Sequence, residues 1–339
     1  MRASTTATAL LSALSIVFAA CDDGAGTGGA GGAGSSTGTT GSTSSTASTT
    51  TATGTTSSTS GATTTASSGG GDPCANLDPG PFTPTVITQK FDGSEDFTFD
   101  DAGGIVSRAG NAIIRVDAND MATTIGTLPQ SSYGLRYGPT KDLFIALPNA
   151  GKIVKVTQAG MASDFATGLS GPNGVYPDLA GNLWVTEFSG GRVIKVDPMG
   201  AKTTIVQGQS SPNGVVLDSA RNVLFYTGYS AGKLFRVDPA GGTPTEVGGV
   251  NGAALDGLTL DECGNVYAVD QGNSRVYRFL LDASGNLVGT PELLANFPQN
   301  VANAQFGQTG FDPHTLYLAG NPGVVYAIAV GVGGAPIPP

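Results

Sequence analysis

Five polar residues recur through the chain at intervals of about 40 residues, each at the start of a short apolar run. They are Glu95, Tyr133, Asn173, Asn213 and Asp256. Two of them carry carboxylates and two carry amide carbonyls, and these hard oxygen donors suit Ca²⁺ or Mg²⁺ better than Zn²⁺. Three such ligands would leave coordination positions open for water and a substrate oxygen. If the fold gathers these side chains, the pattern predicts a divalent-cation site.

The same residues also have a purely structural interpretation. Asn-Gly at 173–174 and 213–214 and Asp-Gly at 256–257 are common turn pairs, and an Asn before a strand often anchors a loop. Each residue taken singly fits this interpretation. Their occurrence at corresponding positions of a repeat favours a shared metal site.

The elements that would gather these residues are copies of one repeat. Segments 171–198, 211–239 and 255–282 each contain an apolar strand, a turn, a strand rich in Val, Leu and aromatics, and a third strand. Further copies begin near Glu95, Tyr133 and Phe306, and a fourth, outer strand falls between copies. Repetition at about 40 residues with this strand content is typical of propeller blades. The sequence therefore predicts an all-β, six-bladed β-propeller whose first strands line a channel and bring the five residues to one mouth.

The sixth copy lacks an outer strand, because the chain ends in the Gly- and Pro-rich segment 331–339. A spare strand-like segment, 85–89, lies before the first copy. Since a ring must cover its last sheet edge, we expect this N-terminal segment to supply the outer strand of blade six. The folded domain would then span residues 72–339.

The first 71 residues predict export rather than folding. Arg2 precedes an apolar run, 9–20, that is too short to span a bilayer and is typical of a signal peptide. The run into Cys21 resembles a bacterial lipoprotein signal, in which the Cys is lipidated, although Phe18 stands where Leu is usual. Ordinary cleavage and secretion is the alternative. Residues 24–71 are all Gly, Ala, Ser or Thr and would form a flexible tether.

These features predict three parts: a signal peptide at 1–20, a lipidated Cys and disordered tether at 21–71, and the propeller at 72–339. The protein would be anchored to a membrane in the periplasm or at the cell surface. Disulfides persist in such compartments. If the first strands start on one face, Cys263 and the start of the closing strand near Cys74 both lie on the opposite face. We therefore expect a Cys74–Cys263 disulfide.

Charge and histidine content exclude several functions. The formal net charge of −10 argues against nucleic acid or anionic lipid as a partner, so the membrane contact would be through the lipid anchor only. The single histidine, His314, falls in a turn after a first strand, on the face away from the strand starts. A Ser-His-Asp triad, a His-rich zinc site and a histidine base are therefore disfavoured.

The repeat and its polar residues together resemble the family of gluconolactonases and regucalcin (senescence marker protein). Its members are six-bladed propellers that hold a divalent cation, usually calcium, in the channel. Glu95 in EDFTF corresponds to the family's Glu in an E-x-P-x-W run, Asn213 to its Asn-Gly and Asp256 to its Asp-Gly. Asn173 corresponds to a substrate-contacting Asn, and the FGQ at Phe306 resembles a final FGG.

This sequence departs from the family at two places. The Pro and Trp that follow the family's Glu are missing after Glu95, and Gly171 stands where sugar-lactonase members carry an Arg. The second departure bears on a sugar-acid lactone as the substrate more than on the metal.

The resemblance implies a calcium-dependent lactonase. Glu95, Asn213 and Asp256 would hold the cation, which would polarise a lactone carbonyl. Asp256 would also act as the general base, and Asn173 would orient the substrate ring. We expect a monomer that acts on a small-molecule lactone or related ester.

Further residues would meet at the rim of the same mouth. Tyr133 is one, and the ends of the second strands bring Arg108, Glu187, Tyr229 and Asp270. They would either set substrate specificity or simply cap the strand ends, and both interpretations stay open.

A second function class competes with the hydrolase. Segment 264–279, GNVYAVDQGNSRVYRF, also resembles NHL repeats, which often bind proteins or glycans through one face of the ring. The alternative is therefore a non-catalytic propeller that binds a protein or glycan partner. NHL blades do not require Glu95, Asn213 and Asp256, whereas a lactonase of this kind would fail without them.

Overall fold

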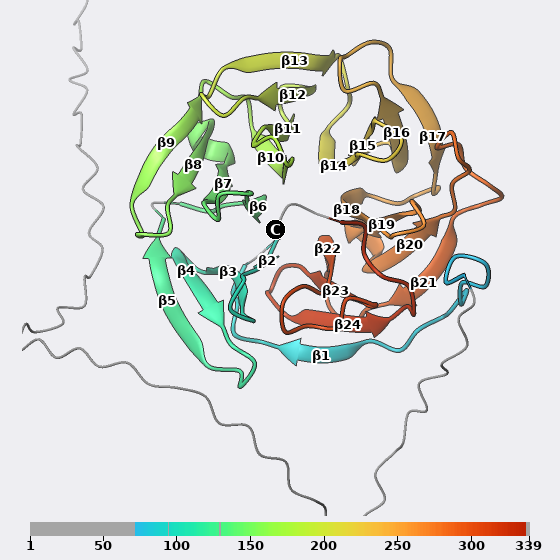
Figure 1. Cartoon of the computed structure of the whole chain (residues 1–339), viewed down its shortest axis with the longest axis horizontal. Helices are drawn as coiled ribbons and strands as arrows, with labels where there is room; N and C mark the ends of the chain where they lie inside the picture. Colours follow the sequence, from blue (N-terminus) through green and yellow to red (C-terminus); the bar gives the residue numbers. More distant parts are fainter. Residues whose placement is uncertain (1–71, 94, 129, 337–339) are drawn as a thin grey trace, which may run out of the picture. The chain divides into compact units, whose positions relative to one another are not determined.

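The computed structural model describes residues 72–93, 95–128 and 130–336. These residues form six four-stranded antiparallel sheets arranged as blades around a channel (Figure 1). The predicted signal peptide, the lipidated Cys21 and the tether lie outside the described residues and stay predictions. Within the described part, no helix combines the length and the apolar character needed to cross a membrane.

Five blades follow one plan, in which four consecutive strands run from the channel outward. Blades one and two contain β2 (Thr98–Phe99), β3 (Ile105–Ala109), β4 (Ala112–Val116), β5 (Ala122–Thr127), β6 (Leu135–Tyr137), β7 (Leu143–Leu147), β8 (Lys152–Val156) and β9 (Ala162–Thr167). Blades three and four contain β10 (Pro172–Pro177), β11 (Leu183–Glu187), β12 (Arg192–Val196), β13 (Lys202–Gln207), β14 (Pro212–Asp218), β15 (Val223–Gly228), β16 (Lys233–Val237) and β17 (Thr245–Gly249). Blade five contains β18 (Leu255–Leu260), β19 (Val266–Asp270), β20 (Arg275–Phe279) and β21 (Glu292–Asn296). The predicted six-bladed propeller is confirmed.

Blade six closes the ring with a strand from the other end of the domain. It contains β22 (Asn303–Phe306), β23 (Thr315–Ala319) and β24 (Val325–Ala329), and β1 (Thr85–Thr88) pairs antiparallel with β24. The register joins Thr85 to Ala327 and Val86 to Tyr326. The predicted closure by the N-terminal segment is confirmed, with a strand one residue shorter than the segment 85–89.

The start of the sixth first strand was predicted wrongly. Phe306 is the last residue of β22 and pairs with Leu316, so it lies at the far end of its strand rather than at its start. The reason is that blade six lacks the polar-Gly pair that marks the start in blades three to five. Asn303 occupies the position that Gly holds in those blades, and the preceding residue, Ala302, is the one that corresponds to Asp256.

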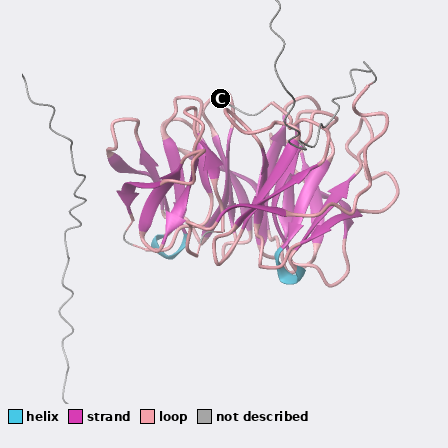
Figure 2. Ribbon diagram, turned by 90° about the horizontal axis from the view of Figure 1, so that it is seen from below, coloured by secondary structure: helices cyan, strands magenta, loops and turns pink. Residues whose placement is uncertain are grey.

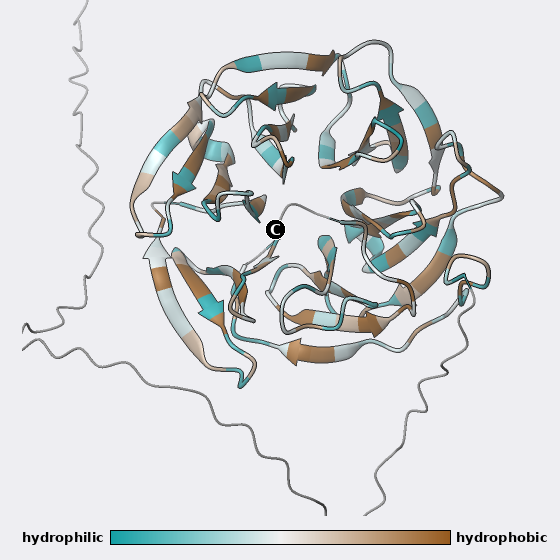
Figure 3. Ribbon diagram, viewed as in Figure 1, coloured by the Kyte–Doolittle hydropathy of each residue, from teal (hydrophilic) through white to brown (hydrophobic). Residues whose placement is uncertain are grey.

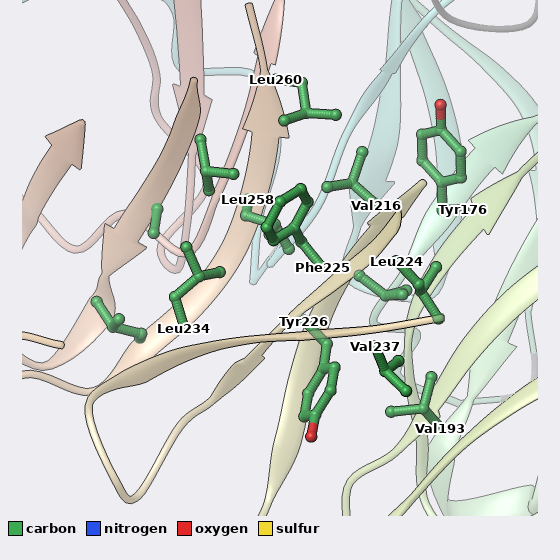
Figure 4. Packing of buried hydrophobic residues seen from close by; sticks show 14 of the residues in the cluster. Tyr176, Val193, Val216, Leu224, Phe225, Tyr226, Leu234, Val237, Leu258 and Leu260 are labelled. Carbon is green, nitrogen blue, oxygen red and sulfur yellow. The ribbon is translucent and has the colours of Figure 1, made fainter. Parts of the chain in front are cut away.

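Burial decreases from the channel outward because each inner strand is packed between neighbouring blades. The second strands β7, β11 and β19 are buried along their whole length, whereas β5 and β9 each have only one fully buried residue. In Figure 3 the outer strands carry both hydrophilic (teal) and hydrophobic (brown) residues. Between blades three, four and five, Phe225, Tyr226 and Leu258 are among the side chains that fill the interface (Figure 4).

The turns gather on two opposite faces of the ring (Figure 2), and the N-terminal segment is fixed to one of them. Cys74 and Cys263 form the disulfide that the topology predicts, with 5.6 Å between their Cα atoms. Arg278, which is fully buried, donates through Nη2 to the carbonyl of Asp78 at 2.9 Å and pairs with Glu292. The segment before β1 is therefore held to blade five by a covalent bond and a buried guanidinium.

Candidate metal centre

The strand register places six residues at one level of the channel. Each of these residues lies three positions before a first-strand residue that occupies the same place in its blade. Those first-strand residues are Thr98, Arg136, Tyr176, Val216, Thr259 and Gln305. The six residues are Glu95, Tyr133, Asn173, Asn213, Asp256 and Ala302. Five of them are the residues singled out in the sequence, so the fold does bring them to one mouth.

A β-bulge in each of three first strands orients one of these side chains. The pairing register shifts between Pro172 and Val175 in β10, between Pro212 and Val215 in β14, and between Leu255 and Leu258 in β18. The residues inside these shifts are the three pairs 173–174, 213–214 and 256–257. Since a bulge adds a residue on one strand and redirects its side chain, the same irregularity orients the polar residue in blades three, four and five.

The glycines of these pairs are not turn residues. Gly174, Gly214 and Gly257 are absent from the described residues with positive φ, so their conformation would admit other residues. Larger residues are excluded by lack of space. A Cβ on Gly174 would lie 2.3 Å from the carbonyl oxygen of Asn213, and a Cβ on Gly214 would lie 2.6 Å from the carbonyl oxygen of Asp256. Glycine is therefore required because neighbouring first strands approach each other closely. The simple turn interpretation of Asn-Gly and Asp-Gly does not hold here.

Asp256 and Glu95 form an electrostatically strained pair. Asp256 is 4% exposed, and burial, followed by the negative charges of Glu95 and Asp96, raises its pKa well above the ordinary value. The pKa of Glu95 rises from 4.5 to about 7, chiefly through burial, and the Arg108 charge opposes this rise. The Asn213 side chain hydrogen-bonds to the Asp256 carboxylate and favours its ionised form.

This donor set fits a hard divalent cation. The buried carboxylate of Asp256 and the half-buried carboxylate of Glu95 would both be stabilised in their charged form by a cation between them. The amide of Asn213 donates to Asp256 through nitrogen, which leaves its oxygen as a third ligand. The described residues contain no cluster of three or more His, Cys, Asp or Glu with metal-binding arrangement, so any cation here depends on this amide and on water as well as on the two acids.

Two tyrosines and one arginine lie within electrostatic range of the acid pair. The charges of Glu95 and Asp256 both contribute to the raised pKa values of Tyr133 and Tyr229, although burial is the larger cause. Tyr229 also donates to Gln271 at 2.7 Å and packs edge-on against Phe188. The Arg108 guanidinium donates to two backbone carbonyls, while its buried Nε has no hydrogen-bond partner.

The two remaining rim acids have structural partners. Glu187 is fully buried, accepts from the backbone N–H of Ser170 at 2.6 Å and pairs with Arg192 across the β11–β12 hairpin. Asp270 accepts from the backbone N–H groups of Ala254 and Asn273 and caps a 3₁₀ turn. These contacts favour the capping interpretation for both carboxylates.

Sequence reasoning missed an ion pair directly below the acid pair. Asp96 accepts from the backbone N–H of Leu135 at 2.9 Å and pairs with Arg136, whose guanidinium also donates to the carbonyl of Phe97. Asp96 occupies the position that Gly holds in blades three to five. The available signals were the Glu-Asp dipeptide at 95–96 and one arginine in an otherwise apolar first strand.

Comparisons with known proteins support the fold. Neither a protein-family model nor a curated protein sequence matches this chain. A gluconolactonase from Xanthomonas campestris is 16% identical, with a TM-score of 0.61 over 73% of this chain and 89% of that one. The calcium-binding protein regucalcin from Agrobacterium tumefaciens is 18% identical, with a TM-score of 0.61 over 76% and 97%. At these identities the resemblance is confirmed at the level of the six-bladed fold.

A lyase shares the propeller architecture as well. Virginiamycin B lyase from Staphylococcus aureus, crystallised with quinupristin, is 19% identical, with a TM-score of 0.54 over 69% of this chain and 79% of that one. The lyase structure is of a catalytically inactive histidine-to-alanine variant. In this chain the only histidine, His314, is 57% exposed beside Asp312 in the turn after β22, on the face opposite the acid pair. The site therefore offers no histidine for a similar role.

Proposed function

We propose that the protein is a divalent-metal-dependent hydrolase of lactones or related esters, with calcium as the expected cation. The observation that carries the proposal is the convergence of Glu95, Asn213 and Asp256 at one mouth, where burial raises the pKa of both acids and the charge of Glu95 raises that of Asp256 further. These three residues would hold the cation. When bound, the cation would polarise the substrate carbonyl and stabilise the developing oxyanion.

The chain's own residues have separate roles in this proposal. Asp256, held by the Asn213 amide, accepts a proton from the attacking water at its carboxylate. The hydroxyl of Tyr133 is protonated at neutral pH, since burial raises its pKa further above the ordinary value of 10.0, and it can donate to a substrate oxygen. The proton of Tyr229 is committed to Gln271, so this residue contributes its ring to the rim. Asn173, in the equivalent position of blade three, orients the substrate ring.

Calcium titration calorimetry on the full chain tests the metal site. We expect one-site binding, loss of binding in Asp256→Ala, and unchanged binding in Glu246→Gln, which removes a carboxylate exposed on the outer strand β17. Hydrolysis of δ-valerolactone in a pH-stat should then require calcium and Asp256. Absence of calcium binding by the folded protein at millimolar concentration would contradict the hydrolase and favour the partner-binding propeller.

We further propose that the enzyme works outside the cytoplasm, on a lipid anchor at Cys21. The Cys74–Cys263 disulfide supports an oxidising compartment. Labelled palmitate should be incorporated by cells that express the full chain and not by cells that express Cys21→Ser. Incorporation by the variant would contradict the anchor.

A further inference from the structure

The opposite mouth of the channel contains a cavity of about 440 Å³. All six first strands line it, through Thr98, Arg136, Tyr176, Val216, Thr259 and Gln305. These residues lie three positions further along the strands than the acid pair and its neighbours, and Glu95, Asn213 and Asp256 are not among the lining residues. The cavity volume lies within the range of about 300–1,000 Å³ that is typical of small-molecule sites.

Polar contacts between neighbouring blades lie between the level of the acid pair and the cavity. Arg136 of blade two reaches Asp96 and the Phe97 carbonyl of blade one. The amide of Gln305, from blade six, also donates to the Phe97 carbonyl. The cavity is therefore a different site from the candidate metal centre.

One arm of the cavity is apolar and runs between blades one and two. Its walls include Phe99, Ile125, Leu143 and Val156. The charged residues beside this arm are mutually paired, Asp100 with Arg115 and Asp101 with Lys141. The arm therefore offers apolar contact area and no unbalanced charge to recognise an ion.

At the inner end of the cavity, Arg136 and Tyr176 can each form a further hydrogen bond. The charge of Arg136 is balanced by Asp96, while its Nη2 has only a marginal 3.5 Å contact with the Asn303 side chain. The Tyr176 hydroxyl has no hydrogen-bond partner among the described residues, and Figure 4 shows it turned away from the packed apolar side chains. The Tyr176 hydroxyl is not among the fully buried, unpartnered polar atoms of the described residues, so it is open to the cavity. An oxygen from a bound molecule would give both groups a further hydrogen-bond partner.

We propose that this cavity binds a neutral amphipathic small molecule, with its apolar body between blades one and two. One hydroxyl or carbonyl oxygen of the molecule contacts Arg136 and Tyr176. An anionic ligand is disfavoured because Asp96 already neutralises Arg136. This site is independent of the proposed hydrolase, since it shares no residue with the metal centre.

Fluorescence titration of the full chain with 2-naphthol tests the site, since this probe combines an apolar body with one hydroxyl group. We expect saturable binding that is at least about fivefold weaker for Tyr176→Phe, because this change removes one hydrogen bond worth about 1 kcal/mol. Naphthalene should bind more weakly still, because it has no oxygen to contact either residue. Thr259→Trp, which fills the cavity from blade five, should abolish binding. Met199→Ala removes a side chain that is 90% exposed on the same face and should bind like the parent.

Two results would overturn the proposal. One is the absence of saturable 2-naphthol binding by the folded parent. The other is parental affinity in either Tyr176→Phe or a folded Thr259→Trp, with folding verified by circular dichroism. Asp256→Ala should bind 2-naphthol like the parent while losing calcium, so failure at one mouth is distinguishable from failure at the other.

Discussion

The two mouths of the channel are built from the same six strands, but one has unbalanced negative charge and the other has paired charges. At the mouth where the first strands begin, burial raises the pKa of Glu95 and of Asp256, and the charge of Glu95 raises that of Asp256 further. The nearby Arg108 only partly offsets the rise at Glu95. At the other mouth, charges are paired: Asp100 with Arg115 and Asp101 with Lys141. Uncompensated negative charge is suited to a cation, whereas balanced charge around an apolar arm is suited to a neutral molecule.

The backbone of the first strands also differs between the two mouths. The polar-Gly bulges interrupt the register at the first mouth, while the same strands pair regularly three residues later. At the bulges, glycine lets neighbouring first strands approach closely; beyond them, larger side chains such as Tyr176 and Val216 occupy the channel. The type of site therefore changes within a single short strand.

The largest expected loss of stability comes from breaking the Asp96–Arg136 ion pair, which lies between the two mouths. Arg136→Met would remove the guanidinium that balances the buried Asp96 charge, which should lower the free energy of unfolding by about 3–5 kcal/mol. Urea unfolding at pH 7 measures this loss. Lys233→Met breaks an exposed pair with Glu246 and should cost less than about 1 kcal/mol. Equal losses in the two variants would contradict a buried, partner-dependent Asp96.

A smaller effect is expected from the bulge glycines. Gly214→Ala places a Cβ 2.5 Å from the Leu258 side chain and 2.6 Å from the Asp256 carbonyl. The resulting overpacking should cost about 1–3 kcal/mol, and displacement of Asp256 should weaken calcium binding. Thermal unfolding and calorimetry measure the two quantities. A stable variant with parental calcium affinity would show that close approach of the strands does not position the acid.

The smallest effect concerns the repulsion at the acid pair, in protein freed of calcium. The folded pKa of Glu95 is about 7 against an ordinary 4.5, so the folded state binds more protons than the unfolded state between these values. The contribution of Glu95 to stability is therefore present at low pH and lost as pH rises through about 7. Glu95→Gln should lack this decline. A shift of this size corresponds to about 3 kcal/mol, and solvent screening reduces it because Glu95 is only half-buried. The variant should therefore be more stable than the parent at pH 8 by about 1–2 kcal/mol.

Comparison of the parent and Glu95→Gln at pH 5 and pH 8 checks this sign. At pH 5 the two proteins should have similar stability, because Glu95 is mostly protonated in the folded parent. Saturating calcium should remove the difference at pH 8 by stabilising the parent only. A parent that gains stability between pH 5 and pH 8 relative to the variant would contradict the repulsion.

The repeat carried most of the fold information. Copies about 40 residues apart, with alternating apolar strands and regular turns, were enough to predict six blades and the closing strand before the first copy. The prediction failed at Phe306, where a short strand without the polar-Gly pair gave no local signal for its start. Local pattern locates an element only where the residues that mark its boundary are present.

The fold, the set of polar residues at one level of the channel and the Cys74–Cys263 pairing could all be predicted from the amino-acid sequence, because each follows from periodicity and topology. The remaining features depend on packing between segments far apart in the chain. Asp96 and Arg136 meet across two blades, Glu187 and Asp270 are committed to local partners, and a cavity opens at the opposite mouth. Side-chain contacts between blades depend on close packing of segments far apart in the chain, and no spacing within the sequence encodes their direction.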